Sequence, residues 1–361
     1  MKNLLINLND FQKLRWELRS IRDLNRFSFS RGALFTILSQ KRIDLVKKKH
    51  PIAMQKLDYI ASYWKSKKKI PPWLNLTPVM SVRILLKAIG FTKSEIRNSL
   101  KNPSKIGDEK IEDLIWNSLF TDYIYSPLAV KHQFARGKLG EAIIKDWLEH
   151  RRIEFRDEYD MRGESKKTPD FFFPEPINVN GKRIKWIESK ALFGDPKTHW
   201  IYSKKQYLRY RELFGDGYVV YWFGYVKGLD SDVDILSSRF FNSRLKNALL
   251  DMKVFTAGVS LLKDENFQKR MEKLAIKSFV NLGCELPVPG VEIPELIKRD
   301  NFREYMKTKD FLEGMAKLIE LYSEGRIMLI CREKDWRKCH RKHISWVLRN
   351  MGFDVIHLRA F

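Results

Sequence analysis

Residues 184–192 have the period-two pattern of a β-strand, but they carry charge where such a strand normally carries apolar side chains. Ile184, Trp186, Glu188 and Lys190 fall on one face of this expected strand, because successive side chains alternate in direction. A carboxylate and an ammonium group on that face break the local rule, and such breaks tend to mark function. We therefore expect this strand to belong to an α/β core and to carry a site.

Two further carboxylates are expected to converge on the strand. Pro169 favours an extended conformation for the residue before it, so Asp170 should open a neighbouring strand. Glu141 lies on an expected amphipathic helix that would place a third carboxylate above both strands. Asp170 and Glu188 would then bind a hard ion such as Mg²⁺ or Mn²⁺ directly, and Glu141 directly or through water. The ion would activate a water and offset phosphate charge, while Lys190 would orient that water or stabilise developing charge.

Each member of this set also has an ordinary explanation. A Glu-x-Lys pair is common in basic chains and usually lies on a solvated face, and a single Glu on a helix is usually at the surface. The order Glu, Asp, Glu-x-Lys at this spacing is more specific than any one member. It favours a metal-dependent phosphodiesterase.

A series of short motifs extends this pattern over about residues 75–240. The motifs are Gly140-Glu141, Phe155-Arg156-Asp157-Glu158, Thr168-Pro169-Asp170, Trp186-Ile187-Glu188-Ser189-Lys190, Phe193-Gly194-Asp195, Phe214-Gly215-Asp216-Gly217 and Val219-Val220-Tyr221-Trp222-Phe223-Gly224. The segment resembles the PD-(D/E)xK nucleases, and more narrowly their T-P-D-motif family of the codanin-interacting nuclease type. The resemblance implies a restriction-endonuclease-like core over residues 129–240, with Glu141, Asp170, Glu188 and Lys190 as the active-site set. It also implies that Gln206 is an auxiliary polar residue, although a plain surface glutamine is an equal alternative.

The net charge of +24 is concentrated toward the amino terminus. Residues 1–100 contain 21 Lys and Arg against 6 Asp and Glu, which supplies +15 of the total. Such a surface predicts salt-dependent binding to a polyanion, whereas lysine-rich faces that only give solubility are the alternative. The concentration at one end favours nucleic acid, and we expect DNA as the partner.

Composition sets the outer limits. A chain of 361 residues with 44% hydrophobic residues is long enough for two or three globular domains. It has no apolar run long enough for a membrane span and no recognisable signal peptide, so we expect a cytoplasmic protein, nucleoid-associated in a prokaryote. Three cysteines argue for a reducing compartment rather than a disulfide framework. A homodimer is left open, because no residue specifies an interface.

Residues 1–128 are expected to form a basic, helical, DNA-binding region. One helix should end within residues 47–51, because proline interrupts helical hydrogen bonding. Residues 77–102 have the form of a helix-turn-helix with a glycine at the turn, although such helix pairs also occur in ordinary bundles. The expected DNA contacts on its second helix are Lys93, Arg97 and Lys101. After the Glu-x-Lys strand, a helix with interleaved aromatic and basic residues adds Lys204 and Lys205.

Residues 226–250 read as a junction, and residues 250–361 as a C-terminal Rossmann-like α/β domain. Residues 326–331 and 353–358 should be parallel strands joined by a helix. Cys331 ends the first strand, and His340 with Arg341 begins the helix, which is where ligands and anions commonly bind in such sheets.

The pattern Cys331-x-Glu333 followed by Cys339-His340-Arg341 resembles the domain-of-unknown-function family 488 over about residues 252–358, although the usual start of that family is poorly matched. We expect these five residues to line a nucleotide or phosphate pocket. A zinc site that also uses His343 is an alternative, but its spacing matches no zinc finger. Buried cysteines beside a structural His-Arg pair are another.

Taken together, these patterns predict a Mg²⁺- or Mn²⁺-dependent endodeoxyribonuclease acting in DNA repair or recombination, with selectivity for junctions or flaps left open. Two alternatives from other classes remain. One is a non-catalytic nucleic-acid-binding scaffold with a nuclease shape. The other is an RNA- or nucleotide-processing enzyme that works through the C-terminal domain.

Overall fold

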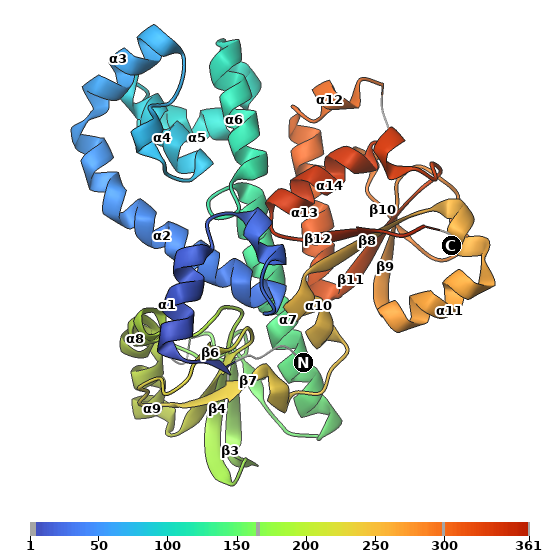
Figure 1. Ribbon diagram of the computed structural model, residues 1–361. Coiled ribbons are helices and arrows are strands. Elements are labelled where there is room, and N and C mark those ends of the chain that lie inside the picture. Colours follow the sequence, from blue (N-terminus) through green and yellow to red (C-terminus); the bar gives the residue numbers. More distant parts are fainter. Residues whose placement is uncertain (1–4, 164–166, 298–299, 360–361) are drawn as a thin grey trace. The chain divides into compact units, whose positions relative to one another are not determined.

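The computed structural model describes residues 5–163, 167–297 and 300–359 (Figure 1). Its contacts divide the chain into two compact units, and each unit combines segments that are distant in sequence. The first unit contains the chain up to Leu38, Arg136–Met252 and Ser323–Gly325. The second unit contains Ser39–Ala135, Lys253–Tyr322 and the chain from Arg326 onward.

A mixed sheet with the strand order β2-β3-β4-β5-β7 forms the centre of the first unit. Strands β3 and β4 form an antiparallel hairpin, β2 pairs antiparallel with β3, and β5 and β7 continue the sheet parallel to β4. All of β5 is buried, as expected for a central strand. The bounds are β2 Arg156–Asp157, β3 Phe171–Val179, β4 Lys182–Lys190, β5 Gly217–Tyr221 and β7 Asp234–Ser237.

Helical segments pack on this sheet through large aromatic side chains. Trp186 of β4 meets Tyr210 edge to face, with 5.4 Å between the ring centroids. The helices of this unit are α1 Leu8–Glu17, the part of α7 (Pro127–His150) from Arg136, α8 Pro196–Tyr202, a π-helical turn Ser203–Tyr207, α9 Leu208–Phe214 and α10 Leu245–Asp251.

The first 38 residues belong with this sheet rather than with the other amino-terminal helices. Strand β1 (Leu5–Ile6) pairs with β6 (Tyr225–Val226), and the rings of Phe11 and Phe193 stack at 5.6 Å. This grouping differs from the three-part division expected from the sequence, because these contacts are long-range and leave no local signal. The three domains expected from the sequence, residues 1–128, 129–240 and 250–361, therefore stay a prediction about which segments fold independently.

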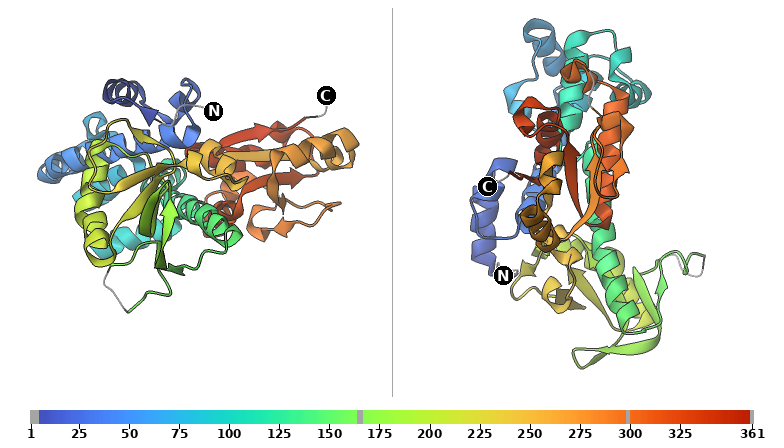
Figure 2. Two further views of the ribbon diagram at one scale, coloured as in Figure 1. Left: turned by 90° about the horizontal axis from the view of Figure 1, so that it is seen from below. Right: turned by 90° about the vertical axis from the view of Figure 1, so that its right-hand side faces the viewer.

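The second unit joins a group of helices to a parallel sheet. The sheet order is β10-β9-β11-β8-β12, and all of its pairings are parallel. The expected strands β11 and β12 are parallel, but β8 lies between them. Figure 2 shows helices running along these strands, coloured orange to red. The bounds are β8 Lys253–Gly258, β9 Ile276–Asn281, β10 Val291–Glu292, β11 Arg326–Cys331 and β12 Asp354–His357.

The helices of the second unit confirm a helical amino-terminal region within a mixed α/β fold. Phe120 packs edge to face on Phe311 at 5.6 Å, which ties an amino-terminal helix to a carboxyl-terminal one. The helices are α2 Arg31–Gln55 from Ser39 onward, α3 Leu57–Lys67, α4 Pro78–Ala88, α5 Lys93–Lys101, α6 Glu109–Thr121, the start of α7, α11 Glu265–Leu274, α12 Phe302–Tyr305, α13 Lys309–Leu321 and α14 Arg341–Asn350.

One expected helix end is wrong. Helix α2 continues through Pro51 to Gln55 instead of ending within residues 47–51. A proline inside a helix loses one backbone hydrogen bond and costs about 3 kcal/mol. Ala53, two residues further along the helix, is fully buried, so tertiary packing supports the helix beyond the proline. Within the described residues, no helix has both the length and the apolar character to cross a membrane.

Candidate functional site

The structure brings Asp170 and Glu188 together across the β3–β4 hairpin. Phe171 is paired with Ile187, so the residue before one faces the residue after the other. The backbone N–H of Asp170 donates to Oε2 of Glu188 at 3.2 Å, and Asp170 Oδ2 accepts from the N–H of Ser189 at 2.7 Å. Glu188 is only 2% exposed. The two carboxylates are therefore held by the sheet ladder itself and not by flexible loops.

Lys190 lies next to these carboxylates. Its Nζ donates to Oε1 of Glu188, and it sits 5.0 Å from the centre of the Tyr202 ring. Burial lowers the pKa of Lys190, but the negative charges of Glu188 and Asp170 outweigh burial and raise it overall. The ammonium group therefore stays charged in a nearly enclosed position.

Glu141 of α7 is the third carboxylate of this group, and it interacts with the others through its charge. Burial, followed by the charge of Glu188, raises the pKa of Glu141. The same two causes, in the same order, raise the pKa of Asp170 well above its ordinary value. Three carboxylates thus share this region with one lysine, and both Glu141 and Asp170 resist ionisation because they are buried and lie near other negative charges.

The acidic oxygens are near one another without forming a closed coordination shell. Among the described residues, the one group whose ligand atoms all lie within 4.8 Å of each other is Cys331, Cys339 and His340. Glu141, Asp170 and Glu188 do not form such a group. Whether Glu141 would reach an ion directly or through water stays a prediction.

Several supporting contacts around the acids were not expected from the sequence. Tyr210 donates its hydroxyl to the carbonyl of Thr168 at 2.8 Å, which fixes the turn before Asp170. Trp222 donates Nε1–H to Oγ of Ser189 at 2.8 Å. A Cβ on Gly140 would lie 2.4 Å from Trp222 Nε1, so only glycine allows α7 this close to β4 and β5. The aromatic runs in the sequence mark these positions, but not their partners.

Gln206 lies in the π-helical turn, and its Oε1 is buried without a hydrogen-bond partner among the described residues. An unsatisfied buried amide oxygen costs about 1–3 kcal/mol. Single π-helical turns are frequent at functional sites. Gln206 is therefore partly buried, and its part as an auxiliary residue stays a prediction.

His199 has a structural role in α8. It is buried, its Nδ1 lies 2.9 Å from the hydroxyl of Tyr221, and that hydroxyl lies 3.3 Å from the hydroxyl of Tyr207. Burial lowers the pKa of His199. A neutral, buried histidine of this kind is suited to bracing the sheet rather than to binding phosphate.

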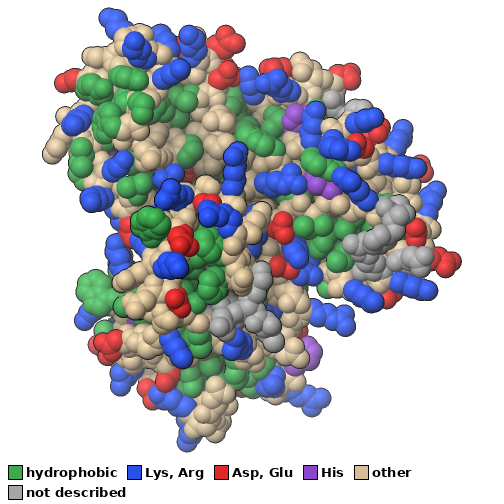
Figure 3. Space-filling model, viewed as in Figure 1, with side chains coloured by type: hydrophobic (Ala, Val, Ile, Leu, Met, Phe, Trp, Pro, Cys, Tyr) green, Lys and Arg blue, Asp and Glu red, His purple; other side chains and the backbone are tan. Residues whose placement is uncertain are grey.

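The expected nucleic-acid contacts are all exposed side chains, but they are divided between the units. Lys204 and Lys205 lie on the π-helical turn of the first unit, whereas Lys93, Arg97 and Lys101 lie on α5 of the second. Figure 3 shows Lys and Arg side chains over much of the visible face. Helices α4 and α5 are present as expected, with the capping box of Thr92 and Glu95 at the start of α5.

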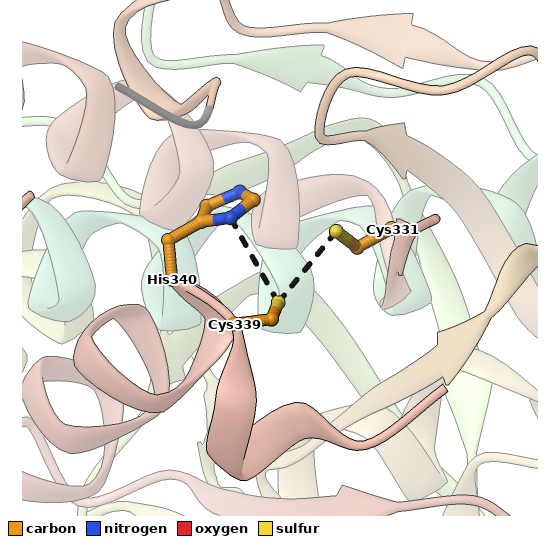
Figure 4. Close-up of side chains that lie close together, drawn as sticks. All are labelled: Cys331, Cys339 and His340. Carbon is orange, nitrogen blue, oxygen red and sulfur yellow. Dashed lines mark hydrogen bonds between the residues drawn. The ribbon is translucent and has the colours of Figure 1, made fainter. Parts of the chain in front are cut away.

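A second buried cluster lies at the carboxyl end of β11 (Figure 4). The sulfurs of Cys331 and Cys339 are 3.6 Å apart, and the sulfur of Cys339 is 3.8 Å from Nδ1 of His340. Arg341, 1% exposed, donates to the Cys339 sulfur through its backbone N–H at 3.3 Å and through Nε at 3.2 Å. Glu333 has an exposed side chain and contributes its backbone carbonyl, which accepts from Arg341.

The two thiols of this cluster are unequal. The hydrogen bond that Cys339 shares with Cys331, together with its contacts to His340 and Arg341, lowers the pKa of Cys339 to about 3 despite burial. That same hydrogen bond and burial raise the pKa of Cys331. His343 is outside the close group and packs against Phe302, with 5.7 Å between the ring centroids.

Comparison with known proteins adds a family to this geometry. The profile described as "Protein of unknown function TPD sequence-motif" matches residues 107–239. A bovine protein is 32% identical over 237 residues, covering 60% of this chain and 84% of that protein. The chain belongs to the TPD-motif family. A human member is 37% identical over 140 residues, covering 38% of this chain and 50% of its own length, and a chicken member is 32% identical over 246 residues, covering 62% and 85%.

All three of these TPD-motif relatives carry the name "CDAN1-interacting nuclease 1". The family match includes Glu141, Asp170, Glu188, Lys190 and Gln206. A second profile, "Domain of unknown function DUF488", matches residues 295–348 and includes the whole thiol cluster. Both resemblances expected from the sequence are thereby confirmed. No solved structure matches the chain.

Proposed function

We propose that the first unit of this TPD-motif protein is a Mg²⁺- or Mn²⁺-dependent nuclease that hydrolyses phosphodiester bonds of DNA. The observation that carries the proposal is the meeting of Asp170, Glu188 and Lys190 on the β3–β4 hairpin. An antiparallel hairpin that continues into parallel strands, with Glu-x-Lys on its second strand, supports a PD-(D/E)xK core. The relatives named as nucleases support the same reaction class.

The residues fit a hard divalent cation. Asp170 and Glu188 would hold it, with Glu141 reaching it through water, because all three offer oxygen and their mutual repulsion needs a positive charge. A bound ion supplies Lewis-acid assistance and a more acidic water. Zinc or another soft metal is less suited to this all-oxygen set.

The chain's own side chains and backbone N–H groups would position the substrate and the ligands of the ion. Lys190 stays protonated beside Glu188, so it can donate to a phosphate oxygen and stabilise charge that develops there. The backbone N–H groups of Asp170 and Ser189 hold the carboxylates in place, so their lone pairs face the site in a fixed direction. Gln206 would act as an auxiliary polar residue, and its buried oxygen has no hydrogen-bond partner among the described residues.

DNA is the substrate that the charge pattern favours. The exposed Lys204 and Lys205 lie in the same turn as Gln206, and the +24 net charge supplies a general attraction to phosphate. The exposed cations of α5 would add a second contact region. Selectivity for junctions or flaps, a role in repair, a cytoplasmic or nucleoid location and assembly as a homodimer are parts of this proposal.

We also propose that the parallel sheet of the second unit is Rossmann-like, since all of its strands are parallel and β11 ends at the thiol cluster. The thiol cluster at the end of β11 is poorly suited to phosphate. The guanidinium of Arg341 is buried and already donates to a sulfur and to backbone carbonyls, so little of it is left for an external anion.

The decisive experiment is a cleavage panel of duplex, flapped, branched and single-stranded DNA, with an RNA of the same sequence, in Mg²⁺, Mn²⁺ or EDTA. The full chain should cut in metal and not in EDTA. Glu188→Gln should remove cleavage while DNA binding persists. Glu175→Gln, which changes an exposed acid on β3, is the matched control and should cut normally.

Two results would overturn the proposal. One is unchanged cleavage by Glu188→Gln. The other is tight binding without cleavage of any substrate in any metal, which would instead establish a non-catalytic scaffold.

A further inference from the structure

We propose that Cys331, Cys339 and His340 bind a zinc ion, at a site separate from the acidic one and with a different preference for metals. The three side chains come from the end of β11 and from the two residues before α14 (Figure 4). Their ligand atoms all lie within 4.8 Å of one another. Thiolate and imidazole are the ligands that zinc prefers, whereas Mg²⁺ and Mn²⁺ prefer oxygen.

The spacing of the ligand atoms matches a tetrahedral zinc centre. Zinc–sulfur bonds of about 2.3 Å and zinc–nitrogen bonds of about 2.0–2.1 Å place two sulfurs roughly 3.8 Å apart and a sulfur and a nitrogen roughly 3.5 Å apart. The observed separations are 3.6 Å between the sulfurs and 3.8 Å between the Cys339 sulfur and His340 Nδ1. A disulfide would need about 2.05 Å, and both cysteines are free.

Burial makes an unused cluster expensive. Cys331 and Cys339 are each 3% exposed and His340 is 4% exposed. Packing of Phe302 on the ring, with 5.2 Å between centroids, holds the imidazole so that Nδ1 faces the sulfur. Buried polar groups cost free energy unless they are paired, and an ion held by the two sulfurs and Nδ1 would pair all three.

The surroundings of Cys339 favour a deprotonated sulfur, which is the form that binds metal. Arg341 donates to that sulfur from its backbone N–H and from Nε, and its remaining acceptors are the carbonyls of Glu333 and Lys334. Outer hydrogen bonds of this kind orient metal ligands and are worth about 10–100-fold in metal affinity.

Charge balance indicates what occupies the fourth position. Two thiolates neutralise the zinc ion, and the buried guanidinium of Arg341 leaves one positive charge in the cluster. A hydroxide or another small anion would neutralise it. Three protein ligands with a fourth position left to water or a small anion are the arrangement of catalytic zinc sites rather than of closed structural ones.

The test is the metal content of the full chain, purified under reducing conditions without chelator. We expect about one zinc per chain by elemental analysis, together with a sulfur-to-metal charge-transfer band when cobalt replaces zinc. Cys339→Ser and His340→Ala should lose both signals, with folding checked by circular dichroism. Cys284→Ser is the matched control, because Cys284 is buried and donates to the Ile330 carbonyl outside the cluster. It should retain the zinc.

Three results would overturn the proposal. The first is a folded chain that binds neither zinc nor cobalt. The second is zinc that survives Cys339→Ser but is lost in Asp170→Asn, which would assign the ion to the acidic site. The third is a Cys331–Cys339 disulfide found by mass spectrometry in the reduced preparation. If the variants fail to fold, protection of the two thiols from alkylation by zinc in the unmodified chain gives the same decision.

Discussion

Each of the two units buries a cluster of ionisable side chains. The two clusters differ in the sign of the charge that surrounds their ionisable groups. On the β3–β4 hairpin, Glu141, Asp170 and Glu188 repel one another and share one lysine. At the end of β11, the sulfur of Cys339 accepts hydrogen bonds from the backbone N–H and the Nε of Arg341, whose guanidinium is buried. The acidic cluster therefore has more negative than positive groups, whereas the sulfur has a cation beside it.

The difference in spacing is equally instructive. The sulfur and nitrogen atoms of the second cluster lie within 4.8 Å of one another, and the oxygens of the three acids do not. A preformed set of soft ligands suits an ion that stays bound. A wider set of hard ligands suits a hydrated ion that arrives with its substrate. One chain would thus hold two metals by two different strategies.

The largest expected effect is that a substitution in either cluster removes the property of that cluster and leaves the other unchanged. Asp170→Asn should lower the cleavage rate by about 10²–10³-fold or more, because it removes a ligand and a charge from the reacting centre, and should leave the zinc content unchanged. Cys339→Ser should abolish zinc binding and leave the cleavage rate within about twofold. Steady-state cleavage and elemental analysis on the same preparations measure both. If either variant loses both properties, the two clusters are not independent.

The next effect concerns the cations of α5, which would contribute binding but no chemistry. Replacing Lys93, Arg97 and Lys101 by Ala should weaken DNA binding about uniformly across sequences. It should also reduce the slope of log K against log salt by about 0.9 per lost phosphate contact. Fluorescence anisotropy at several salt concentrations measures the slope. Zinc content and the single-turnover rate at saturating DNA serve as controls, and an unchanged slope would remove α5 from the interface.

A smaller expected effect tests whether the buried carboxylates destabilise the fold when no metal is bound. In metal-free protein, Asp170→Asn should raise the free energy of unfolding by about 1 kcal/mol, because it removes a buried carboxyl group, relieves the repulsion from Glu188 and keeps an oxygen for the N–H of Ser189. The stabilisation that Mg²⁺ gives to the parent chain should disappear in this variant. Urea titrations with EDTA and with Mg²⁺ give both numbers. A destabilised variant would show that the repulsion between these carboxylates is weaker than the contacts that the Asp170 carboxylate makes.

The sequence predicted the parts of both clusters that follow from strand periodicity. The facing positions of Asp170 and Glu188 and the place of Cys331 at a strand end are confirmed. What periodicity does not contain is the distance between side chains from separate segments. The 3.6 Å approach of Cys331 and Cys339 depends on how the residues between them fold, and these form a short 3₁₀ turn and an Asp335 cap.

Other features escaped prediction because long-range contacts decide them. Strand β7 lies in the segment that reads as a junction, since its Asp and Ser residues break the apolar pattern and it pairs only through β5. Strand β8 lies between β11 and β12 in the parallel sheet, and no local signal in the sequence indicates that position. The π-helical turn that buries the oxygen of Gln206 is likewise invisible in an ordinary helical pattern.

The smallest expected effect is a loss of stability at acid pH that comes from His357 in the second unit. Burial, and then the charge of Arg349, lowers the pKa of His357 to about 4, with Arg341 and Arg359 acting in the same sense and Cys339 opposing them. Nε2 of His357 lies 2.8 Å from an Arg349 N–H group and accepts from it, so the folded state needs a neutral ring. Trp336 stacks on that ring at 3.7 Å.

A histidine with a lowered folded-state pKa binds its proton more readily when unfolded. Its contribution to stability is therefore present above pH about 6.5 and is lost as the pH falls toward about 4. After allowance for solvent screening, the loss should be about 1–2 kcal/mol. His357→Gln should remove this dependence, so the difference in unfolding free energy between parent and variant should shrink between pH 7 and pH 4.5. A constant difference across that range would contradict the prediction. It would show that the ring of His357 binds a proton as readily in the folded chain as in the unfolded one, and that the Arg349 contact does not hold it neutral.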